Sequence, residues 1–542
     1  MDGNFSNRCF FKKNLEFKFI VNKLVQVSFN REAQKMTLSK STQINKSKSA
    51  QKTEYTSIKN HKMIIDGQLV DSHGLDRIQI ECPATKEIFA TVPRGNNQDV
   101  NFAVKAASDA FRKWSLVEPR ERGKLLLRIA DAIENEIENL ANIIAQETGN
   151  AIRTQARPEA KLVADIFRYF GGLGGELKGE TIPLGENFLS YTRREPIGVV
   201  GAIIPWNAPV LLGALKIAPA LCAGNTIVMK AAEDAPLGIL RIAEICQNFI
   251  PKGVVNLITG FGEECGTPLI EHPYVRKISF TGSTGVGKLI MQAASERIVP
   301  VSLELGGKSP SIVYPDANED WAVEGVMAAM RFTRQSQSCT AGSRLFLHEK
   351  IFDSFLEKLI SKLKNLKIGD PLDEANDIGS LINRKQYSRV LNYIQEGMEH
   401  PSSELICGGM PPENGEMSKG YFTLPTIFSN TTNEWRLAKE EIFGPVLTAI
   451  SWKDEENVIK MANDSHYGLA GYVWTHDIGK GLKTAHSLEA GWVQVNQGLG
   501  QMPGQSYGGV KQSGIGREFS LNGMLESFTQ TKNVTVSLST PS

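Results

Sequence analysis

The sequence IGVVGAIIPWNAPVLLGALKIAPALCAGNTIVM, residues 197–229, decides the fold. It begins with an apolar, β-branched run (197–204), continues with a helical stretch (208–222) and ends in a second such run (225–229). The alternation continues toward residue 280, with helices expected over 236–248 and 262–271 and strands over 254–258 and 278–280. Strands that alternate with helices of this length form βαβ units, whose parallel sheet is covered by helices on both faces.

A second α/β region follows between residues 310 and about 475, again with short apolar strands between helical stretches. On the other side of the opening stretch, residues 98–170 repeat apolar side chains at helical spacing, which predicts amphipathic helices packed on a core. Residues 64–95 contain short strand-like runs, and the tail 532–538 (KNVTVSL) predicts a late strand that pairs with another domain or subunit. The predicted fold class is therefore α/β, with two doubly wound domains and segments left over for assembly.

The composition is typical of a soluble globular protein. The chain has 542 residues, of which 41% are hydrophobic and 22% charged, and its formal net charge is +1. These values exclude disordered and collagenous classes, and the near balance of charge indicates neither a nucleic acid nor a membrane as partner. The seven cysteines are widely spaced and form no CxxC, and the eight histidines lack metal-ligand spacing. We therefore expect a reducing compartment, no disulfide framework and no metal site.

Residues 1–62 differ from the rest of the chain. They carry 13 Lys and Arg against 4 Asp and Glu, a net charge of +9, whereas residues 63–542 have a net charge of −8. The segment lacks the apolar centre of a signal peptide, and no uncharged run in the chain is convincing as a membrane span. We expect a disordered tail or an over-extended start, with a mitochondrial transit peptide as the alternative. The predicted location is the cytoplasm, or the mitochondrial matrix if residues 1–62 are a transit peptide.

Glycine-rich turns at strand ends mark a candidate dinucleotide site. No GxGxxG motif opens a βαβ unit, and the nearest run is Gly282–Gly287 (GSTGVG), between the strand 278–280 and a helix over 288–293. Free N–H groups and the dipole at a helix N-terminus favour a pyrophosphate, although an ordinary glycine turn explains the pattern as well. A second, weaker glycine turn contains Gly262 and Gly266.

Polar side chains follow two of the expected strands. Asn207 comes after the strand 197–204, at the carboxyl end of a parallel strand, which is where ligands bind in open α/β sheets. Lys230 and Glu233 follow the strand 225–229. The Glu233 carboxylate could accept hydrogen bonds from ribose hydroxyls, and a solvated ion pair is the alternative interpretation.

Cys339 is the candidate nucleophile. It lies in QSCTAGSR (337–344), among small polar residues and glycine, whereas a core cysteine prefers apolar neighbours. Glu304 lies between two leucines in LELGGK (303–308). A carboxylate in that setting is either a surface residue on an edge strand or a base with a raised pKa.

Taken together and in this order, the motifs resemble the aldehyde dehydrogenase superfamily over residues 64–538. The motifs that carry the resemblance are Pro205-Trp-Asn207, Lys230 with Glu233, Phe280-Thr-Gly-Ser283, Leu303-Glu-Leu-Gly-Gly-Lys308, Gln337-x-Cys339-x-Ala-Gly-Ser-Arg344, Glu441-Ile-Phe-Gly-Pro-Val446, Asn463 with Tyr467-Gly-Leu, and Gly508-Gly-x-Lys-x-Ser-Gly514 with Gly516-Arg517-Glu518. Eight motifs in one order are specific, where one alone would not be. The resemblance implies a Rossmann-like cofactor domain, a catalytic domain and a β-flap for oligomerisation.

The resemblance also implies an activity, the NAD-dependent oxidation of an aldehyde to a carboxylic acid. Cys339 would attack the aldehyde carbon to form a thiohemiacetal, whose oxyanion Asn207 and the Cys339 backbone N–H would hold. Hydride transfer to the nicotinamide would leave a thioester, and Glu304 would activate the water that hydrolyses it. Water is expected rather than coenzyme A, because relatives that use coenzyme A lack this base.

The same resemblance assigns residues to the cofactor. Ser283 and its helix N-terminus would take the pyrophosphate, and Lys230 and Glu233 would hold the adenosine ribose. Glu441 would hold the nicotinamide ribose, and Phe443 would lie against the ring. Because a carboxylate at the ribose repels a 2′-phosphate, Glu233 predicts NAD rather than NADP. The other implied cofactor positions are Ile203, Pro205, Trp206, Gly262, Gly266, Phe280, Gly282 and Leu305.

The implied substrate pocket is roomy and of mixed polarity. Its positions are Ala208, Leu212, Leu215, Ser338, Thr340, Gln501 and Tyr507. Ala208 and Leu215 stand where aromatic residues are frequent, and an aromatic cage for a trimethylammonium group needs several rings. We therefore expect an aliphatic or aromatic aldehyde. The alternatives are a betaine-aldehyde or semialdehyde specificity, a thiol esterase, and a non-catalytic relative.

The expected domains are a leader, a cofactor domain, a catalytic domain and an oligomerisation segment. Their predicted bounds are 1–62 for the leader, 63–177 and 197–306 for the NAD-binding domain, 307–519 for the catalytic domain, and 178–196 with 520–538 for the oligomerisation segment. The implied partners are an aldehyde and further copies of the chain, in a dimer or a dimer of dimers.

Overall fold

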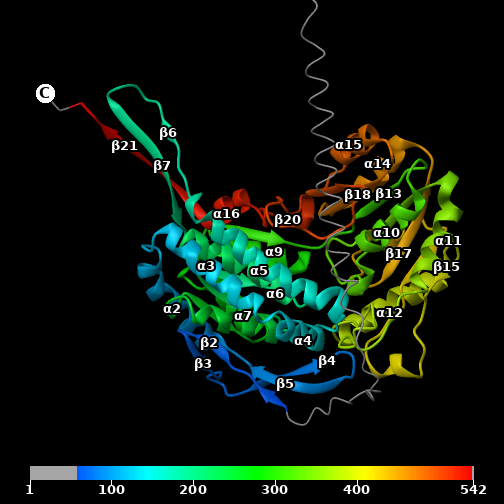
Figure 1. Ribbon diagram of the computed structural model, residues 1–542, viewed down its shortest axis with the longest axis horizontal. Helices are drawn as coiled ribbons and strands as arrows, with labels where there is room; N and C mark the ends of the chain where they lie inside the picture. The colour runs from blue at the N-terminus through cyan, green and yellow to red at the C-terminus, as the bar shows by residue number, and fades with distance from the viewer. Residues whose placement is uncertain (1–57, 540–542) are drawn as a thin grey trace, which may run out of the picture. The chain divides into compact units, whose positions relative to one another are not determined.

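The structure, a computed structural model, describes residues 58–539 (Figure 1). Most of the predicted leader, residues 1–57, lies outside the described residues. The last part of that leader is in the structure, because β1 (Lys59–Asn60) pairs in parallel with β5 (Glu87–Pro93). Because β1 is an exposed polar segment that pairs through main-chain groups, its sequence has no apolar alternation from which a strand could be predicted. In the same small sheet β5 also pairs with β4 (Arg77–Cys82).

The stretch 197–280 forms the centre of an eight-stranded sheet. The order across the sheet is β20 (Gly514–Ile515), β12 (Val301–Glu304), β11 (Val275–Thr281), β8 (Val199–Ile203), β9 (Thr226–Lys230), β10 (Val255–Ile258), β2 (Met63–Ile65) and β3 (Gln68–Val70). The five strands from β12 to β10 are parallel: four of them are the predicted strands, β12 adds a fifth, and antiparallel strands flank them on both sides. β20 comes from the end of the predicted catalytic domain 307–519, so that range overlaps the cofactor-domain sheet.

Helices cover both faces of this sheet. Side chains alternate between the faces of a strand, so neighbouring residues enter different cores. Ile227 packs in the core that contains α6 and α7, whereas Val228 packs in the core that contains α2. The helices of this half are α2 (Asn97–Trp114), α3 (Pro119–Glu134), α4 (Ile137–Thr148), α5 (Arg157–Gly172), α6 (Pro209–Ala223), α7 (Leu237–Gln247), α8 (Thr267–Glu271) and α9 (Thr284–Ser295). Two covered faces confirm the doubly wound prediction.

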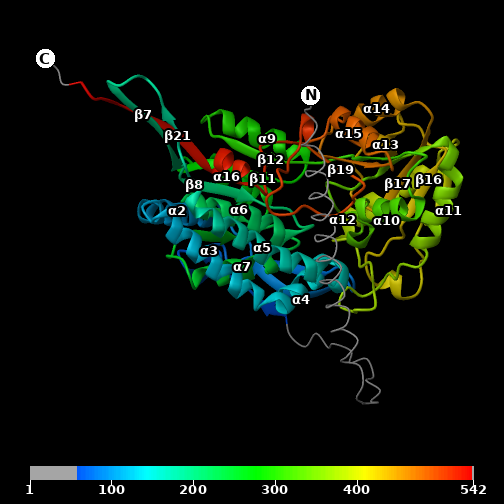
Figure 2. The ribbon, with the colours of Figure 1, turned by 45° about the horizontal axis from the view of Figure 1, so that its top comes forward.

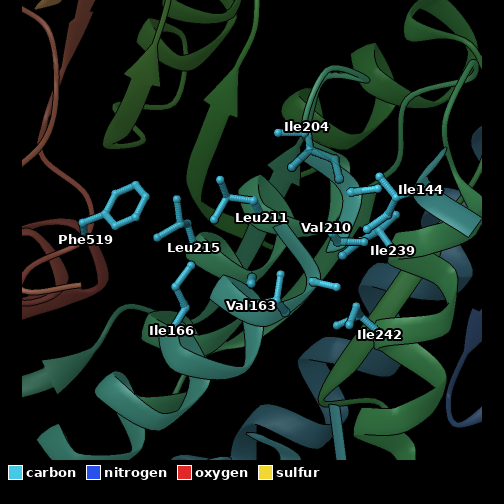
Figure 3. Packing of buried hydrophobic residues seen from close by; sticks show 14 of the residues in the cluster. Ile144, Val163, Ile166, Ile204, Val210, Leu211, Leu215, Ile239, Ile242 and Phe519 are labelled. Atoms are coloured by element: carbon cyan, nitrogen blue, oxygen red, sulfur yellow. The ribbon is translucent and has the colours of Figure 1, made fainter. Parts of the chain in front are cut away.

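The helix α6 is the centre of the larger core. Nearly every side chain of α6 is buried, because α5 packs along it and α7 lies beside it (Figure 3). Figure 3 shows Val210, Leu211 and Leu215 pointing into this packing. A helix that is apolar on all sides fits only in such a buried place. Over residues 58–539, no helix is long and apolar enough to cross a membrane.

A second sheet of seven strands follows, in the region predicted from residue 310. Its order is β15 (Glu404–Cys407), β16 (Thr426–Ser429), β17 (Val446–Trp452), β14 (Arg344–His348), β13 (Pro310–Val313), β18 (Ala470–Trp474) and β19 (Trp492–Val495). All neighbours are parallel except β15 with β16. The main helices here are α10 (Glu319–Ala329), α11 (Phe352–Leu363), α12 (Arg384–Glu399), α14 (Glu455–Asn463) and α15 (Ile478–Ser487). β19 extends the sheet beyond the predicted limit near residue 475.

The sequence predicts a helix over 320–334, and in the structure this helix ends early. The helix α10 stops at Ala329, and Arg331 takes a left-handed conformation with φ 59° before a single 3₁₀ turn over Phe332–Arg334. Gln335 and Ser336 are also left-handed, with φ of 50° and 52°. Non-glycine residues in this region cost backbone energy, and such positions cluster at functional sites. Here they bend the chain just before Cys339.

The predicted oligomerisation segments pair with each other. β7 (Phe188–Pro196) runs antiparallel to β21 (Thr529–Ser537) over its whole length, and β6 (Thr181–Ile182) adds a short third strand. The helix α16 (Leu521–Phe528) leads into β21 (Figure 1, Figure 2). Apolar side chains at Phe188, Leu189 and Val536 are exposed on this sheet.

Candidate active site

A cavity of about 540 Å³ is lined by strand ends and loops of the eight-stranded sheet on one side, and by α12 and loops around the seven-stranded sheet on the other. Its lining residues are Pro205, Trp206, Asn207, Leu212, Thr281, Gly282, Ser283, Thr284, Gly285, Glu304, Leu305, Gly306, Cys339, Gln386, Arg389, Glu440, Glu441, Phe443, His466 and Tyr467. The parallel strands β8, β11 and β12 end at Ile203, Thr281 and Glu304. The cavity thus lies at the carboxyl edge of the sheet, where ligands bind in open α/β folds.

All three predicted catalytic residues, Cys339, Glu304 and Asn207, line this cavity. So do seven predicted cofactor positions, Pro205, Trp206, Gly282, Ser283, Leu305, Glu441 and Phe443, and one predicted pocket position, Leu212. The predicted positions that do not line it are Ile203, Lys230, Glu233, Gly262, Gly266, Phe280, Ala208, Leu215, Ser338, Thr340, Gln501 and Tyr507.

Cys339 lies in the loop between the 3₁₀ turn and β14. Its Sγ is 3.6 Å from the Oη of Tyr507. Burial raises the pKa of the Cys339 thiol to about 12, with further raising effects from Glu441 and Glu304 and a lowering effect from the Tyr507 hydrogen bond. The thiol is therefore protonated at neutral pH, and attack on an electrophile requires the site to favour the thiolate.

Glu304 ends β12, and its side chain is buried, with 4% of the residue exposed. Across residues 58–539, neither of its carboxylate oxygens has a hydrogen-bond partner. Burial, and then the neighbouring Glu518, raise the pKa of Glu304 well above 4.5, while Lys216 and Arg517 lower it. A carboxylate without donors is a strong proton acceptor for a molecule that enters the cavity.

A buried ion pair stands beside Glu304. Lys216 of α6 donates to Glu518 over 2.9 Å, and both side chains are almost fully buried. The sequence predicted no site role for either residue, although Glu518 lies in the last motif of the resemblance. The sequence does single out Lys216, because it is the only charged residue within the apolar stretch 197–229. A charge in a fully apolar helix needs a buried partner, and the sequence alone does not say which.

Asn207 follows β8, and its side chain faces the nucleophile loop. Its Nδ2 donates to the backbone carbonyl of Gln337 over 2.9 Å, two residues before Cys339. The side chain of Asn150 donates in turn to the Asn207 carbonyl, over 3.3 Å. An amide N–H held this close to the nucleophile can reach an oxyanion that forms on the carbon bound to sulfur.

The end of β11 and the start of α9 carry groups that suit a pyrophosphate. Ser283 caps the helix α9, which begins at Thr284 rather than at the predicted residue 288. Gly282 is required here, since a Cβ would collide with the ring of Phe280. The hydroxyl of Thr281 is buried and has no partner in the described part of the chain. A helix N-terminus beside an unpartnered hydroxyl fits an anionic group.

Lys230 and Glu233 form an ion pair of 2.8 Å just outside the cavity lining. Lys230 is buried at the end of β9, opposite Ile203 of β8, while the Glu233 side chain is 39% exposed. Gly266 adjoins the Ile203 side chain. These positions therefore lie at the same carboxyl edge of the sheet as the cavity and extend the site along it.

Glu441 lies in the loop before β17 and lines the cavity. Its Oε1 accepts a hydrogen bond of 3.0 Å from the backbone N–H of Gly307, and burial raises its pKa to about 7. Phe443 takes a left-handed conformation, φ 62°, and its ring meets Trp206 edge to face at 5.4 Å. This ring pair closes one side of the cavity.

Most of the predicted substrate positions lie in two places, near the start of α6 and beside Cys339. Ala208 and Leu215 are buried in the larger core and do not line this cavity. Of the three predicted positions near the start of α6, only Leu212 lines the cavity. Ser338 and Thr340 flank Cys339, and their hydroxyls lie 3.1 Å apart.

Known proteins with similar sequences and structures share this arrangement of the chain. The sequence profile described as Aldehyde dehydrogenase family matches residues 69–534. Aldehyde dehydrogenase 1 of Tanacetum cinerariifolium is 42% identical over 482 residues, which is 88% of this chain and 95% of that protein. An NAD+ complex of aldehyde dehydrogenase from Bacillus cereus is 38% identical with a TM-score of 0.86, covering 89% of this chain and 97% of that one. Betaine aldehyde dehydrogenase from Staphylococcus aureus in complex with NAD+ is 35% identical with a TM-score of 0.86, covering 89% and 95%.

Proposed function

Because the chain belongs to the aldehyde dehydrogenase family, we propose that it oxidises an aldehyde to a carboxylic acid with NAD as hydride acceptor. The observation that carries this proposal is the meeting of Cys339, Glu304 and Asn207 in one cavity. A nucleophile, a base without hydrogen-bond donors and an amide N–H are the groups that acyl chemistry on a thiol needs.

The residues present fit NAD. The N-terminus of α9 with Ser283, and the unpartnered hydroxyl of Thr281, suit its pyrophosphate. Glu441 would accept from the nicotinamide ribose, and Lys230 with Glu233 would hold the adenosine ribose at the carboxyl edge of β9. NAD supplies the hydride acceptor when it is bound. The NAD+ complexes among the similar structures support this choice.

Cys339 performs the first step of the proposed reaction. Its proton leaves to solvent in the cavity, and the sulfur adds to the aldehyde carbon while the C=O pair moves onto oxygen. Asn207 Nδ2–H exchanges the Gln337 carbonyl for this oxyanion, and the Cys339 backbone N–H is the second donor. Cys339 would hold the acyl group as a thioester once the oxyanion has re-formed the C=O bond and the hydride of that carbon has passed to the bound acceptor.

Glu304 performs the second step. It takes a proton from a water molecule whose oxygen attacks the thioester carbon, and the bond from that carbon to Cys339 Sγ then breaks. The products are the carboxylic acid and the free nucleophile. Glu518 and Lys216 lie beside Glu304 and set its charge, since a negative Glu518 raises and a positive Lys216 lowers the pKa of Glu304.

The substrate we propose is an aliphatic or aromatic aldehyde. The similarity to a betaine aldehyde dehydrogenase makes betaine aldehyde the second candidate. Around the cavity, the aromatic lining residues are Trp206, Phe443 and Tyr467, and the first two close on each other edge to face. Rings arranged this way present little open aromatic surface to a trimethylammonium group.

The test is NADH formation by the full-length protein against short aliphatic, aromatic, amino-aldehyde and betaine aldehydes. Cys339→Ala runs beside Cys407→Ala, which removes a half-buried thiol on β15, outside the cavity. We expect activity in the wild type and in Cys407→Ala and none in Cys339→Ala. Undiminished turnover in Cys339→Ala would refute the proposal, and the best substrate would define the subclass.

We also propose that the sheet of β7 and β21 joins copies of the chain. Its exposed apolar residues and long open edge are features that a second subunit can cover. Light scattering after size exclusion is the test. We expect a dimer or a dimer of dimers, and a monomer at enzyme-assay concentrations would contradict the proposal.

A further inference from the structure

The hydroxyl of Tyr507 is in hydrogen-bond range of the nucleophile sulfur, at 3.6 Å from Cys339 Sγ. The Tyr507 side chain is buried, and only 4% of the residue is exposed. Within residues 58–539, the hydroxyl makes no hydrogen bond besides this one. A buried phenol usually has a partner, and here that partner is the reacting atom.

The ring of Tyr507 is held firmly. Trp492 and Phe519 meet it edge to face, with centroids 5.8 and 5.7 Å away. Its backbone exchanges two hydrogen bonds with Glu518, of 3.2 and 2.7 Å. The hydroxyl therefore comes to the sulfur on a fixed ring, which reduces the entropy lost when the contact forms.

We propose that Tyr507 is a catalytic residue, which donates its O–H to the Cys339 thiolate and keeps that thiolate available for attack. The proposal rests on the proposed function for its use in turnover. A phenol can donate to a thiolate, whereas a thiolate has no proton to give back, so the bond exists in the reactive form of the pair. As the sulfur adds to the aldehyde carbon, negative charge moves to the new oxyanion and the Tyr507 bond weakens.

The charges around Cys339 make such a donor necessary. The carboxylates of Glu304 and Glu441 disfavour the thiolate, and the Arg334 guanidinium favours it. Tyr472 is also close, but its hydroxyl donates to the Thr340 carbonyl over 2.9 Å instead of to sulfur. Burial raises the pKa of the Tyr507 phenol well above 10, so Tyr507 stays protonated and remains a donor.

The test compares Tyr507→Phe with Tyr472→Phe in the full-length protein. Both substitutions remove one buried hydroxyl near Cys339 and keep the ring, and only the first removes a contact with sulfur. The readout is the alkylation rate of Cys339 by iodoacetamide without cofactor, over a series of pH values, with the modified residue located by peptide mass. This readout does not depend on turnover.

We expect Tyr507→Phe to lower the thiolate population of Cys339 by about 10- to 100-fold at each pH, as loss of a hydrogen bond to a charged group should. A thiolate of higher pKa is also more nucleophilic, with a Brønsted slope near 0.4–0.5, so at fixed pH alkylation slows by about 3- to 16-fold. Tyr472→Phe should leave the thiol pKa unchanged. NADH formation should fall in Tyr507→Phe while the KM for NAD stays the same.

Two results would overturn the proposal. One is a pH profile of Tyr507→Phe that superimposes on the wild type. The other is an equal slowing in Tyr472→Phe, which would mean that any hydroxyl near the loop acts through packing. Failure of the proposed function would appear elsewhere, as NADH formation by Cys339→Ala, and would leave the alkylation comparison intact.

Discussion

Replacing Glu304 by Gln should separate the two halves of the reaction. The substitution keeps the shape of the side chain. It breaks no hydrogen bond in the described structure, since neither carboxylate oxygen has a partner there. It removes the proton acceptor for water and also a charge that Glu518 repels. The variant should therefore fold and form the thioester but hydrolyse it slowly.

The size of the effect follows from what Glu304 does. General base catalysis contributes about 10²- to 10⁴-fold in rate, which is about 3 to 5 kcal/mol in the barrier of hydrolysis. Attack by Cys339 uses other groups, so its rate should change far less. The pKa of Glu304 is raised, and only its ionised form accepts a proton, so wild-type hydrolysis should rise with pH above the usual carboxyl range.

Rapid mixing with aldehyde and NAD distinguishes the two steps. We expect Glu304→Gln to give a burst of about one NADH per site, followed by a steady rate lower by two to four orders of magnitude. Glu296→Gln, an exposed carboxylate after α9, should behave as the wild type. If the burst disappears together with the steady rate, Glu304 acts before the thioester forms, and the assignment made here is wrong.

The same substitution should change stability in a direction set by linkage. The pKa of Glu304 is higher in the folded state than its ordinary value of 4.5, so protonation stabilises the fold below pH 4.5 and this contribution is lost as pH rises toward the folded pKa. Gln does not ionise. In urea unfolding, the free energy of unfolding of Glu304→Gln should therefore rise relative to that of the wild type as pH increases. A difference between the two that does not change with pH would contradict the raised pKa.

Three further predictions concern the neighbouring groups. Asn207→Ala should lower kcat by about 10²- to 10³-fold through loss of one oxyanion donor, measured as the NADH burst rate with Asn207→Asp as comparison. Lys216→Met should cost about 3–5 kcal/mol in urea unfolding, because it leaves Glu518 buried and unpaired, and the double variant with Glu518→Leu should recover much of that loss. Glu233→Gln should raise kcat/KM for NADP relative to NAD, since it removes the repulsion of a 2′-phosphate, and an unchanged ratio would show that Glu233 does not face the ribose.

Much of the fold could be predicted because the physics is local in sequence. The apolar alternation over 197–280 specifies parallel strands and covering helices, and the four parallel strands β8 to β11 are found there. The position of Asn207 at a strand end was enough to place it beside the cavity. What could not be predicted depends on pairing across long sequence distances, such as the return of β20 to the first sheet beside β12. The two residues of β20 carry no pattern that names their partner.

Side-chain direction limited the site prediction in the same way. The predicted positions Ala208 and Leu215 lie at and within α6, but both are buried in the larger core, and of the predicted positions near them only Leu212 lines the cavity. The contact of the Tyr507 hydroxyl with the Cys339 sulfur also could not be predicted from the sequence. Its position was expected to contribute an aromatic face to the substrate, and its distance to the Cys339 sulfur is set by packing against Trp492 and Phe519.

A raised pKa does not by itself separate a catalytic carboxylate from a structural one in this protein. Burial raises the pKa of Glu147 to about 8, and Glu159 is raised for the same reason. Both, however, accept backbone N–H groups at the start of a helix: Glu147 accepts from Leu237 and Gly238 of α7, over 2.6 and 2.9 Å, and Glu159 from Leu211 of α6.

Glu304 differs in what its oxygens touch. Burying the Glu304 carboxylate without a hydrogen-bond donor lowers the free energy of unfolding, and no hydrogen bond within residues 58–539 compensates for it. A hydrophobic residue of similar volume would be more stable there, so the carboxylate is best understood through what enters the cavity. By this criterion Glu147 and Glu159 are helix caps, and Glu304 is the carboxylate that suits the proposed role of base. Substituting Gln at 147 should therefore lower stability by loss of a cap, while the same change at 304 should lower turnover and leave the fold intact.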